Sequence, residues 1–448
     1  MRKHMMYFVC LAIIFISGHS QGFTQLSMSV QIRTRSEMRD GQGTLLPKGS
    51  DAAFFVSQRS RLNVQYVMPR IKAGFSLQDV RIWGQDVSTI NRNTVQELNG
   101  LMLHEAWAEV LLSDTNNKSN RLELKIGRQE LVYDDQRLVG NLDWLQQARR
   151  HDAALIKFER NSWRLHGAFA FNQNRENQSG TVFNSTSPSG YAATTNGGVM
   201  YKSMQMFYAA RSFRSGHLSF LFLSDQFSRY STDSLNNVLV KNYRAGTWAR
   251  HTTGFYYESG MEHAVFNASA YYQFGRNNAG EKTSAILLSA FGSHKTRKWN
   301  IGAGIDFTSG SPGGGTNKTF DPLYGTPHKF WGAMDYFYAG SGFGKGGLVD
   351  VFAKIRYQAT SRFSITADAH SFSSASSIPD VSGRRFGEEV DVIANWLITR
   401  DVSLEGGVAH FFNTAALTSP SVKNVANAKQ GANWAYVMLN VKPKFIFK

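Results

Sequence analysis

The chain has almost no cysteine, little proline and no long apolar segment, and each shortage excludes a class of protein. Cys10 is the single cysteine, and it lies in a short apolar run near the start of the chain. Removal of that run would leave no thiol for disulfides or for cysteine-based zinc sites. No segment reaches the about 18 apolar residues of a membrane-spanning helix. Only 9 prolines interrupt the 448 residues, which suits long strands.

The first residues have the form of a secretory signal peptide. Basic residues precede an apolar run, Met5–Ile16, and small and polar residues follow it. The run is too short to span a bilayer, which needs about 20 apolar residues. We expect cleavage between Ser20 and Phe23, where two neighbouring bonds both fit the small-x-small pattern. Residues 1–22 would then be the signal peptide and 23–448 a single mature domain without cysteine.

Apolar and polar residues alternate along much of the mature chain. The clearest example is the C-terminal end, where one parity carries Val437, Leu439, Val441, Phe445 and Phe447 and the other carries Asn440 and lysines. Because successive strand side chains point to opposite faces, one face is apolar and the other basic. In an outer-membrane barrel the apolar face meets lipid and the polar face lines water. The mean hydropathy of −0.31 fits a barrel, since only every second strand residue must be apolar.

Short polar turns alternate with longer polar stretches along the chain. The eight short turns are Met68–Arg70, Ser113–Asn120, Glu159–Ser162, Phe213–Gly216, Glu258–Glu262, Lys295–Lys298, Ala359–Arg362 and Thr399–Asp401. The nine longer stretches are about 40–57, 84–103, 130–152, 172–203, 225–246, 274–283, 308–331, 371–388 and 413–432. In outer-membrane barrels such turns are periplasmic and such loops extracellular. The pattern predicts an all-β transmembrane antiparallel barrel of eighteen strands, with sixteen as the alternative, and both termini in the periplasm.

Charged residues follow the same alternation. The polar parity of three strands carries Arg33, Arg35 and Glu37, then Arg59 and Arg61, and later Lys354 and Arg356. A lipid-facing Arg or Lys near the bilayer midplane costs about 2–4 kcal/mol, so these rows should face the lumen. Two interpretations stay open. The arginines form a track that selects anions and pairs bidentately with carboxylates, or they are neutralised by interior acids, namely Glu37, Glu105, Glu109 and Glu123.

The charge balance bears on the partners. The formal net charge is +16, and it falls by two with Arg2 and Lys3 in the signal peptide. Such an excess favours an anionic partner. For a secreted chain we expect anionic glycans, lipopolysaccharide phosphates or small anions, and no nucleic acid.

No catalytic motif accompanies this pattern. The G-x-S-x-G match at Gly18–Gly22 falls at the end of the signal peptide and lacks the strand–turn–helix context of a nucleophile elbow. No H-E-x-x-H sequence occurs, and Gly310–Gly315 lacks the Lys-Ser/Thr ending of a phosphate-binding loop. We therefore expect no enzymatic activity, no cofactor and no metal.

Two long motifs resemble those of a known family. The segment GRQELVYDDQRLVGNLDWLQQARRHDAALIKF (Gly127–Phe158) is similar to the central signature of alginate-export-type outer-membrane porins, and FDPLYGTPHKFWGAMDYF (Phe320–Phe337) to a second signature. LQDVRIWGQD (Leu77–Asp86) is a weaker third match. The resemblance implies an eighteen-stranded monomeric barrel with a narrow pore rich in Arg and Lys. In the characterised bacterial case that pore passes alginate, a polyuronate, out of the cell.

The resemblance also supplies candidate pore residues. They are Arg128, Arg137, Arg150 and Asp152 in the first motif, Lys329 and Asp335 in the second, and Arg81 in the third. The expected function is an outer-membrane channel with a basic lumen that passes anionic solutes, such as a uronate-containing polysaccharide or oligosaccharide, and that contacts outer-membrane lipid and lipopolysaccharide. The alternatives are a nonspecific porin whose basic rows are structural, an outer-membrane enzyme and an adhesion barrel.

Overall fold

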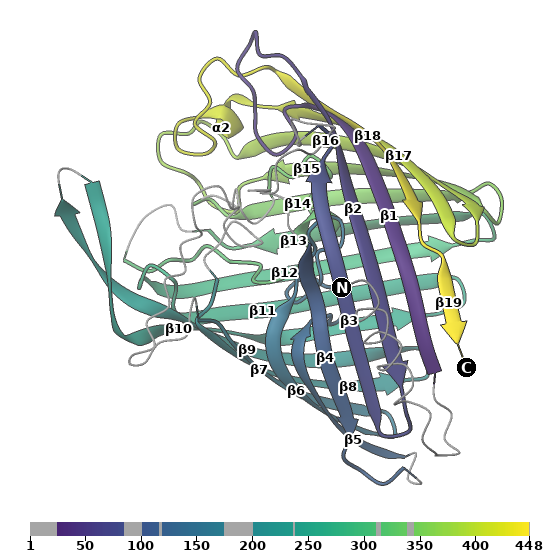
Figure 1. Ribbon diagram of the computed structural model, residues 1–448. Coiled ribbons are helices and arrows are strands. Elements are labelled where there is room, and N and C mark those ends of the chain that lie inside the picture. The colour runs from purple at the N-terminus through teal and green to yellow at the C-terminus, as the bar shows by residue number, and fades with distance from the viewer. Residues whose placement is uncertain are drawn as a thin grey trace, which may run out of the picture.

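A single antiparallel sheet closes on itself to form a barrel (Figure 1). The computed structural model describes residues 25–84, 101–115, 119–173, 200–235, 238–310, 315–337 and 345–447. The expected signal peptide lies outside these residues. β1 (Gln25–Asp40) closes the barrel, because it pairs with β2 (Ala53–Val67) on one side and with β18 (Gly431–Val441) and β19 (Lys444–Phe447) on the other.

The remaining strands each pair with their neighbours in sequence. They are β3 (Ile71–Ile82), β4 (Met102–Leu111), β5 (Asn120–Gln129), β6 (His151–Arg160), β7 (Trp163–Phe171), β8 (Ser203–Phe213), β9 (Gly216–Leu235), β10 (Val238–Gly260), β11 (Ala264–Arg276), β12 (Lys282–Lys295), β13 (Trp299–Thr308), β14 (Leu348–Gln358), β15 (Phe363–Ser373), β16 (Arg385–Thr399) and β17 (Val402–Asn413). β18 and β19 form one wall strand, interrupted at Pro443, which has no N–H to donate. The wall therefore has eighteen strands, which confirms the predicted number.

The wall is apolar outside and polar inside, as the alternation predicts. Large side chains such as Ile126, Val351 and Val408 are exposed on the outer face. Arg59 and Asp350, by contrast, are buried inside. An exposed apolar band around a polar interior is the arrangement of a barrel surrounded by lipid.

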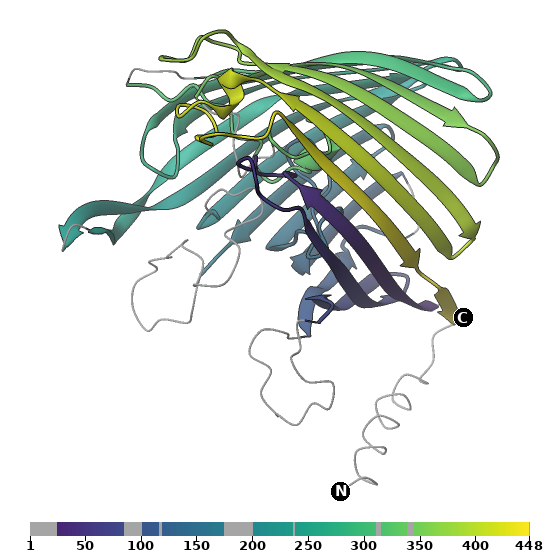
Figure 2. The ribbon, with the colours of Figure 1, turned by 90° about the horizontal axis from the view of Figure 1, so that it is seen from above.

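Short turns and long connections lie at opposite ends of the barrel (Figures 1 and 2). All eight predicted turns fall at breaks between consecutive strands. The described ends of the chain lie at the short-turn end, because Gln25 pairs with Val67 and Leu26 with Phe447.

One predicted long loop is wrong. Within the predicted loop 225–246, residues 225–235 and 238–246 belong to β9 and β10, which pair up to Leu235 and Val238. The resulting ribbon projects beyond the other strands (Figure 1). Its Ser, Asn and Arg content resembles that of a loop because a strand outside the membrane needs no lipid-facing apolar side chains.

Two long connections fold into the barrel. The first is 130–150, between β5 and β6, and the second includes 315–337, between β13 and β14, with the 3-10 helix η1 (Pro327–Lys329). We call them the first and second inward loops. The Gly140 N–H donates to the Tyr324 carbonyl at 2.9 Å, which joins the two loops.

The inward loops, and not the wall alone, provide much of the core. Their buried side chains include Leu138, Leu142, Phe320, Trp331, Met334 and Phe337. The helix α2 (Ala415–Thr418) covers part of β16 from a third connection. Among the described residues, no helix has the length and apolar character needed to cross a membrane.

Candidate solute-binding site in the lumen

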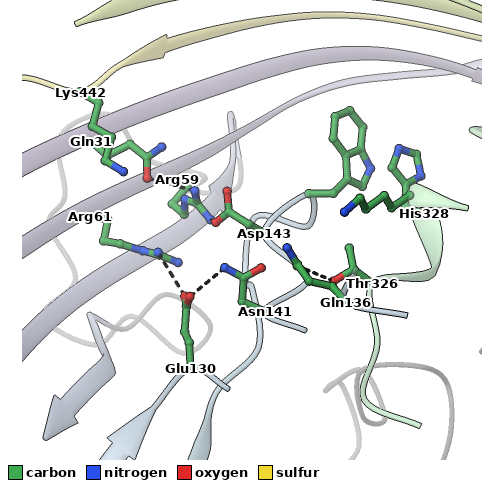
Figure 3. A pocket seen from close by; sticks show the side chains of 12 residues that line it. Gln31, Arg59, Arg61, Glu130, Gln136, Asn141, Asp143, Thr326, His328 and Lys442 are labelled. Atoms are coloured by element: carbon green, nitrogen blue, oxygen red, sulfur yellow. Dashed lines mark hydrogen bonds and ion pairs between the residues drawn. The ribbon is translucent and has the colours of Figure 1, made fainter. Parts of the chain in front are cut away.

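A polar cavity of about 540 Å³ lies between the first two strands and the inward loops (Figure 3). Its lining is Gln31, Arg59, Arg61, Glu130, Gln136, Asn141, Asp143, Trp144, Thr326, His328, Lys329 and Lys442. Cavities of roughly 300–1,000 Å³ hold small organic ligands. The volume and the lining therefore suit a polar solute.

The basic side of the cavity comes from the register of β1 and β2. Arg33 and Arg59 lie directly opposite each other, an arrangement of like charges that is unfavourable unless an anion joins it. The anion is Asp143 of the first inward loop. Its Oδ1 accepts from Arg59 Nη1 at 2.8 Å, and its Oδ2 accepts from Arg33 Nη1 at 3.3 Å.

Asp143 differs from its two partners in exposure. The side chains of Arg33 and Arg59 are 5% and 1% exposed, whereas that of Asp143 is 48% exposed. Burial works against ionisation of Asp143, but the guanidinium groups of Arg59 and Arg33 hold the pKa of its carboxyl below the usual value. The carboxylate is therefore ionised at neutral pH and accessible to solvent.

Arg61, two residues further along β2, has a different acidic neighbour, Glu130. Its guanidinium lies 3.8 Å from Glu130 and donates from Nε to Gln78 Oε1 at 2.8 Å. Glu130 also accepts from Asn141 at 2.8 Å (Figure 3). It contacts His104 at 2.8 Å as well. Burial raises the pKa of Glu130, but these hydrogen bonds and the Arg61 charge outweigh it and lower the pKa overall.

Trp144 holds the first inward loop in place. Its ring stacks on His328 at 4.3 Å, and the Arg35 guanidinium lies 4.3 Å from the ring centre. Arg35 also donates to the Trp144 carbonyl at 3.0 Å. These contacts fix the position of the adjacent Asp143.

The second inward loop is fastened to acidic side chains of the wall. The Met334 N–H donates to Glu389 at 2.7 Å, and the Ala333 N–H donates to Asp391 at 3.2 Å. The preceding residue, Gly332, has a φ of +79°, and a Cβ there would run into the Glu389 carboxyl group. Glycine is needed at this close approach.

Comparison with known proteins decides the family. A profile of the family described as alginate export matches residues 24–428. The chain belongs to the alginate export family. No curated protein matches the chain.

Solved structures share the fold of this family member. A BenF-like porin from Pseudomonas fluorescens Pf-5 is 11% identical, with a TM-score of 0.61, over 94% of this chain and 99% of the porin. OccAB1 of Acinetobacter baumannii is 10% identical, with a TM-score of 0.61, over 94% and 97%. OccK9 (OpdG) of Pseudomonas aeruginosa is 12% identical, with a TM-score of 0.56, over 94% and 98%. The chain thus shares the β-barrel fold of outer-membrane porins.

The predicted pore residues of this alginate export family member divide by position. Arg59, Arg61 and Lys329 line the cavity. Arg33, Arg35 and Glu37 lie in the lumen but are buried, and Glu37 accepts from Arg35 at 2.8 Å. Lys354 and Arg356 share the inward parity of Asp350 nearer the short turns, where Lys354 pairs with Asp368 at 2.8 Å.

Two predicted residues on the inward loops have a supporting position. Asp335 accepts from Gln42 at 2.7 Å and contacts His328 Nδ1 at 2.8 Å, so it orients a cavity residue. Arg137 is only 4% exposed and pairs with Asp306 at 2.6 Å. It does not line the cavity, contrary to the prediction, because the loop that carries it is pressed against the wall.

Arg128 and Asp152 do not face the lumen, so the prediction is wrong for them. They lie opposite each other on β5 and β6 and share the parity of Ile126 and Ile156, which are exposed on the outer face. Two hydrogen bonds of 2.8 Å join the pair. Mutual neutralisation is what allows the charges on this face.

Arg81 also lies outside, and Arg150 does not line the cavity. Arg81 pairs directly with Gln58, the neighbour of inward-facing Arg59, so it must point outward. The register between β3 and β2 is continuous over this segment, and a shift occurs only on the β4 side, between Ser76 and Leu77. Arg150 contacts the Met102 sulfur at 3.8 Å and does not line the cavity.

The sequence analysis missed several residues that line the cavity. Asp143 and His328 stand inside the two family-like motifs, but no spacing in the sequence marks them as neighbours of Arg33 or Trp144. Gln31 and Lys442 share the lumenal parity of β1 and of the C-terminal strand. Parity could have identified these two.

Proposed function

We propose that the barrel is a channel for anionic solutes and that uronate-containing polysaccharides or oligosaccharides are its substrates. The observation that carries the proposal is Asp143. A carboxylate from the chain itself sits between Arg33 and Arg59, at the place where a uronate carboxylate would bind.

The exposure of Asp143 suits exchange. A solute carboxylate can displace a half-exposed side chain and take over hydrogen bonds of 2.8 and 3.3 Å. Charge-assisted hydrogen bonds to arginine are strong and directional. Lys329 and Lys442 add further positive groups along the cavity. Conduction requires several moderate contacts, because a single tight site would trap the solute.

A nonspecific porin is the second candidate, and a specific observation favours it. Interior acids neutralise part of the basic lumen, since Glu109 and Glu123 pair with Lys72 and Lys157 on the wall from β3 to β6. Against this stands the cavity, whose lining has four basic side chains, Arg59, Arg61, Lys329 and Lys442, and only two acids, Glu130 and Asp143. The barrel fold and the export family favour a channel over an enzyme or an adhesion protein.

The proposal includes an orientation. By the rule for outer-membrane barrels, the short turns and both termini are periplasmic and the long connections extracellular. We further propose a monomer, surrounded by outer-membrane lipid and lipopolysaccharide, after removal of residues 1–22.

Blockade of single-channel current tests the proposal. Oligomers of uronic acid should interrupt the current at concentrations where neutral oligosaccharides of equal length do not. Arg59→Gln together with Arg61→Gln should weaken the block about tenfold or more, because each arginine supplies a charge-assisted hydrogen bond. Arg128→Gln with Asp152→Asn, which removes both charges of the outer-face pair, is the matched control and should leave the block unchanged. Equal block by acidic and neutral oligomers would contradict the proposal.

A further inference from the structure

The projecting ribbon of β9 and β10 has no role in closing the barrel. β8 pairs with β9 only up to Gln226, and β11 pairs with β10 only up to Arg250. Beyond these residues, over 227–235 and 238–249, the two strands pair only with each other among the described residues. The ribbon stands clear of the wall at the end away from the C-terminus (Figure 2).

An aromatic cluster stabilises the ribbon. Tyr230 contacts Tyr243 with ring centres 6.0 Å apart and Trp248 at 5.1 Å, and Lys241 Nζ lies 4.4 Å from the Tyr230 ring centre. A two-stranded hairpin alone is marginally stable in water. Cross-strand aromatic pairs add about 0.2–1 kcal/mol each, which accounts for the aromatic residues but not for the arginines.

The arginines of the ribbon form an unfavourable pair. Arg229 and Arg244 lie directly opposite each other, and like charges in that position destabilise a sheet. Arg229 Nε donates to the Thr247 carbonyl at 3.0 Å, and Arg244 Nε donates to Ser231 Oγ at 3.1 Å. Within the described part of the chain, neither arginine has an ion pair. Both are exposed, so their remaining N–H groups are available to an anion.

The parity of β9 places this arginine pair on the lumenal side. Asp225 and Phe227 are buried on the inward face at the base of the ribbon, and Arg229 has the same parity two residues further on. Because side chains alternate along a strand, the face that carries Arg229 and Arg244 continues the inner surface of the barrel outward.

We infer that the ribbon is a docking surface for the uronate polysaccharide itself, outside the mouth of the channel. The inference rests on the proposed function and on its orientation of the barrel. The arginine pair binds carboxylates of the polysaccharide, while the pair Tyr230 and Tyr243, one position along, stabilises the ribbon from its other face. Lipopolysaccharide phosphates have related chemistry, but the pair faces the lumenal side and not the surrounding leaflet.

Single-channel block from each side of the bilayer tests the inference on the full-length protein. The probe is an oligomer of uronic acid, and the variant is Arg229→Gln with Arg244→Gln. From the side of the ribbon, the rate of block should fall at least fivefold and depend less on salt, because the arginines attract the anion before it enters. From the short-turn side, the rate should stay unchanged, and the duration of each block should not change on either side. Arg297→Gln with Lys298→Gln, in a short turn, is the matched control.

The outcomes separate the inference from the proposed function. Suppose that acidic oligomers block the wild type from the short-turn side, and that they block the ribbon variant at the wild-type rate from the ribbon side. The docking surface is then refuted and the channel proposal stands. If acidic oligomers block the wild type from neither side, both fail. If the variant loses binding to lipopolysaccharide vesicles while its rates of block are normal, the occupant is the membrane lipid and the inference is overturned.

Discussion

Two sectors of the barrel wall carry buried charge, and they use it differently. In the basic sector, on β1 and β2, Arg33 and Arg59 meet Asp143, whose side chain is half-exposed. In the acidic sector, on β13 to β16, Asp306 and Glu389 are buried. Both are bound by groups of the inward loops. One sector faces the cavity and the other holds the loops that shape it.

The difference follows from the cost of burying charge. A buried charge without a partner costs several kcal/mol. The acidic sector therefore needs permanent partners, and it has Arg137 and backbone N–H groups. In the basic sector the partner is in contact with water, so it can be exchanged for a solute at small cost. Structure and transport thus depend on separate sets of charges.

Among changes in the acidic sector, removal of the Arg137 side chain should reduce the stability of the protein most. Arg137→Met leaves Asp306 charged and buried, and we expect a loss of about 3–5 kcal/mol in the free energy of unfolding. Urea unfolding in lipid vesicles measures this loss. Adding Asp306→Asn should recover part of it. Arg356→Met, an exposed lumenal control, should change stability little, and an equal loss there would contradict the account.

A hydrogen-bond acceptor on β16 should matter less than a charge. Glu389→Leu leaves the buried Met334 N–H without its acceptor, which costs about 1–3 kcal/mol. Glu389→Gln keeps an oxygen in place and should cost far less. The same unfolding measurement compares the two variants. Equal stabilities would show that the loop does not depend on this contact.

In the basic sector, loss of the internal carboxylate should strengthen binding of the anionic solute. Asp143→Asn removes the anion that competes with the solute between Arg33 and Arg59. We expect tighter block by uronic acid oligomers, up to about tenfold, which corresponds to about 1.4 kcal/mol. Titration of the single-channel block measures the affinity. Weaker block would mean that Asp143 assists the solute instead of competing with it.

Acidification should have the smallest effect. Because the pKa of Asp143 is lowered from 3.8, its pairing with the arginines is complete above that pH and is lost only as the pH falls through the lowered value. The part of the selectivity change that Asp143 causes should therefore appear below about pH 4. Reversal potentials across this range, compared with those of Asp143→Asn, isolate this part. A change near pH 6 that Asp143→Asn abolishes would contradict the assignment.

Periodicity predicts the wall of this protein better than it predicts the interior. Alternation identified the inward arginines of β1 and β2, and polar turns located the strand ends, because lipid on one side imposes both patterns. Gly127 shares the polar parity of β5, so strict alternation puts Arg128 on the outer face, where the structure has it. The motif resemblance had suggested the opposite.

Contacts between distant loops could not be predicted. Asp143 reaches Arg33 from 110 positions away, and Arg137 reaches Asp306 across 169. No local pattern encodes these pairings, because they depend on how two inward loops pack together. The ribbon was missed for a different reason, since a strand in water has no lipid to impose alternation.

The reversal potential of a single barrel in a salt gradient tests the central claim most directly, that the arginines of the cavity select anions. The account predicts anion preference for the wild type and a potential close to zero for Arg59→Gln with Arg61→Gln. Arg128→Gln with Asp152→Asn, on the outer face, should keep the wild-type value. An unselective or cation-preferring wild type, or a double variant that is as anion-selective as the wild type, would contradict it.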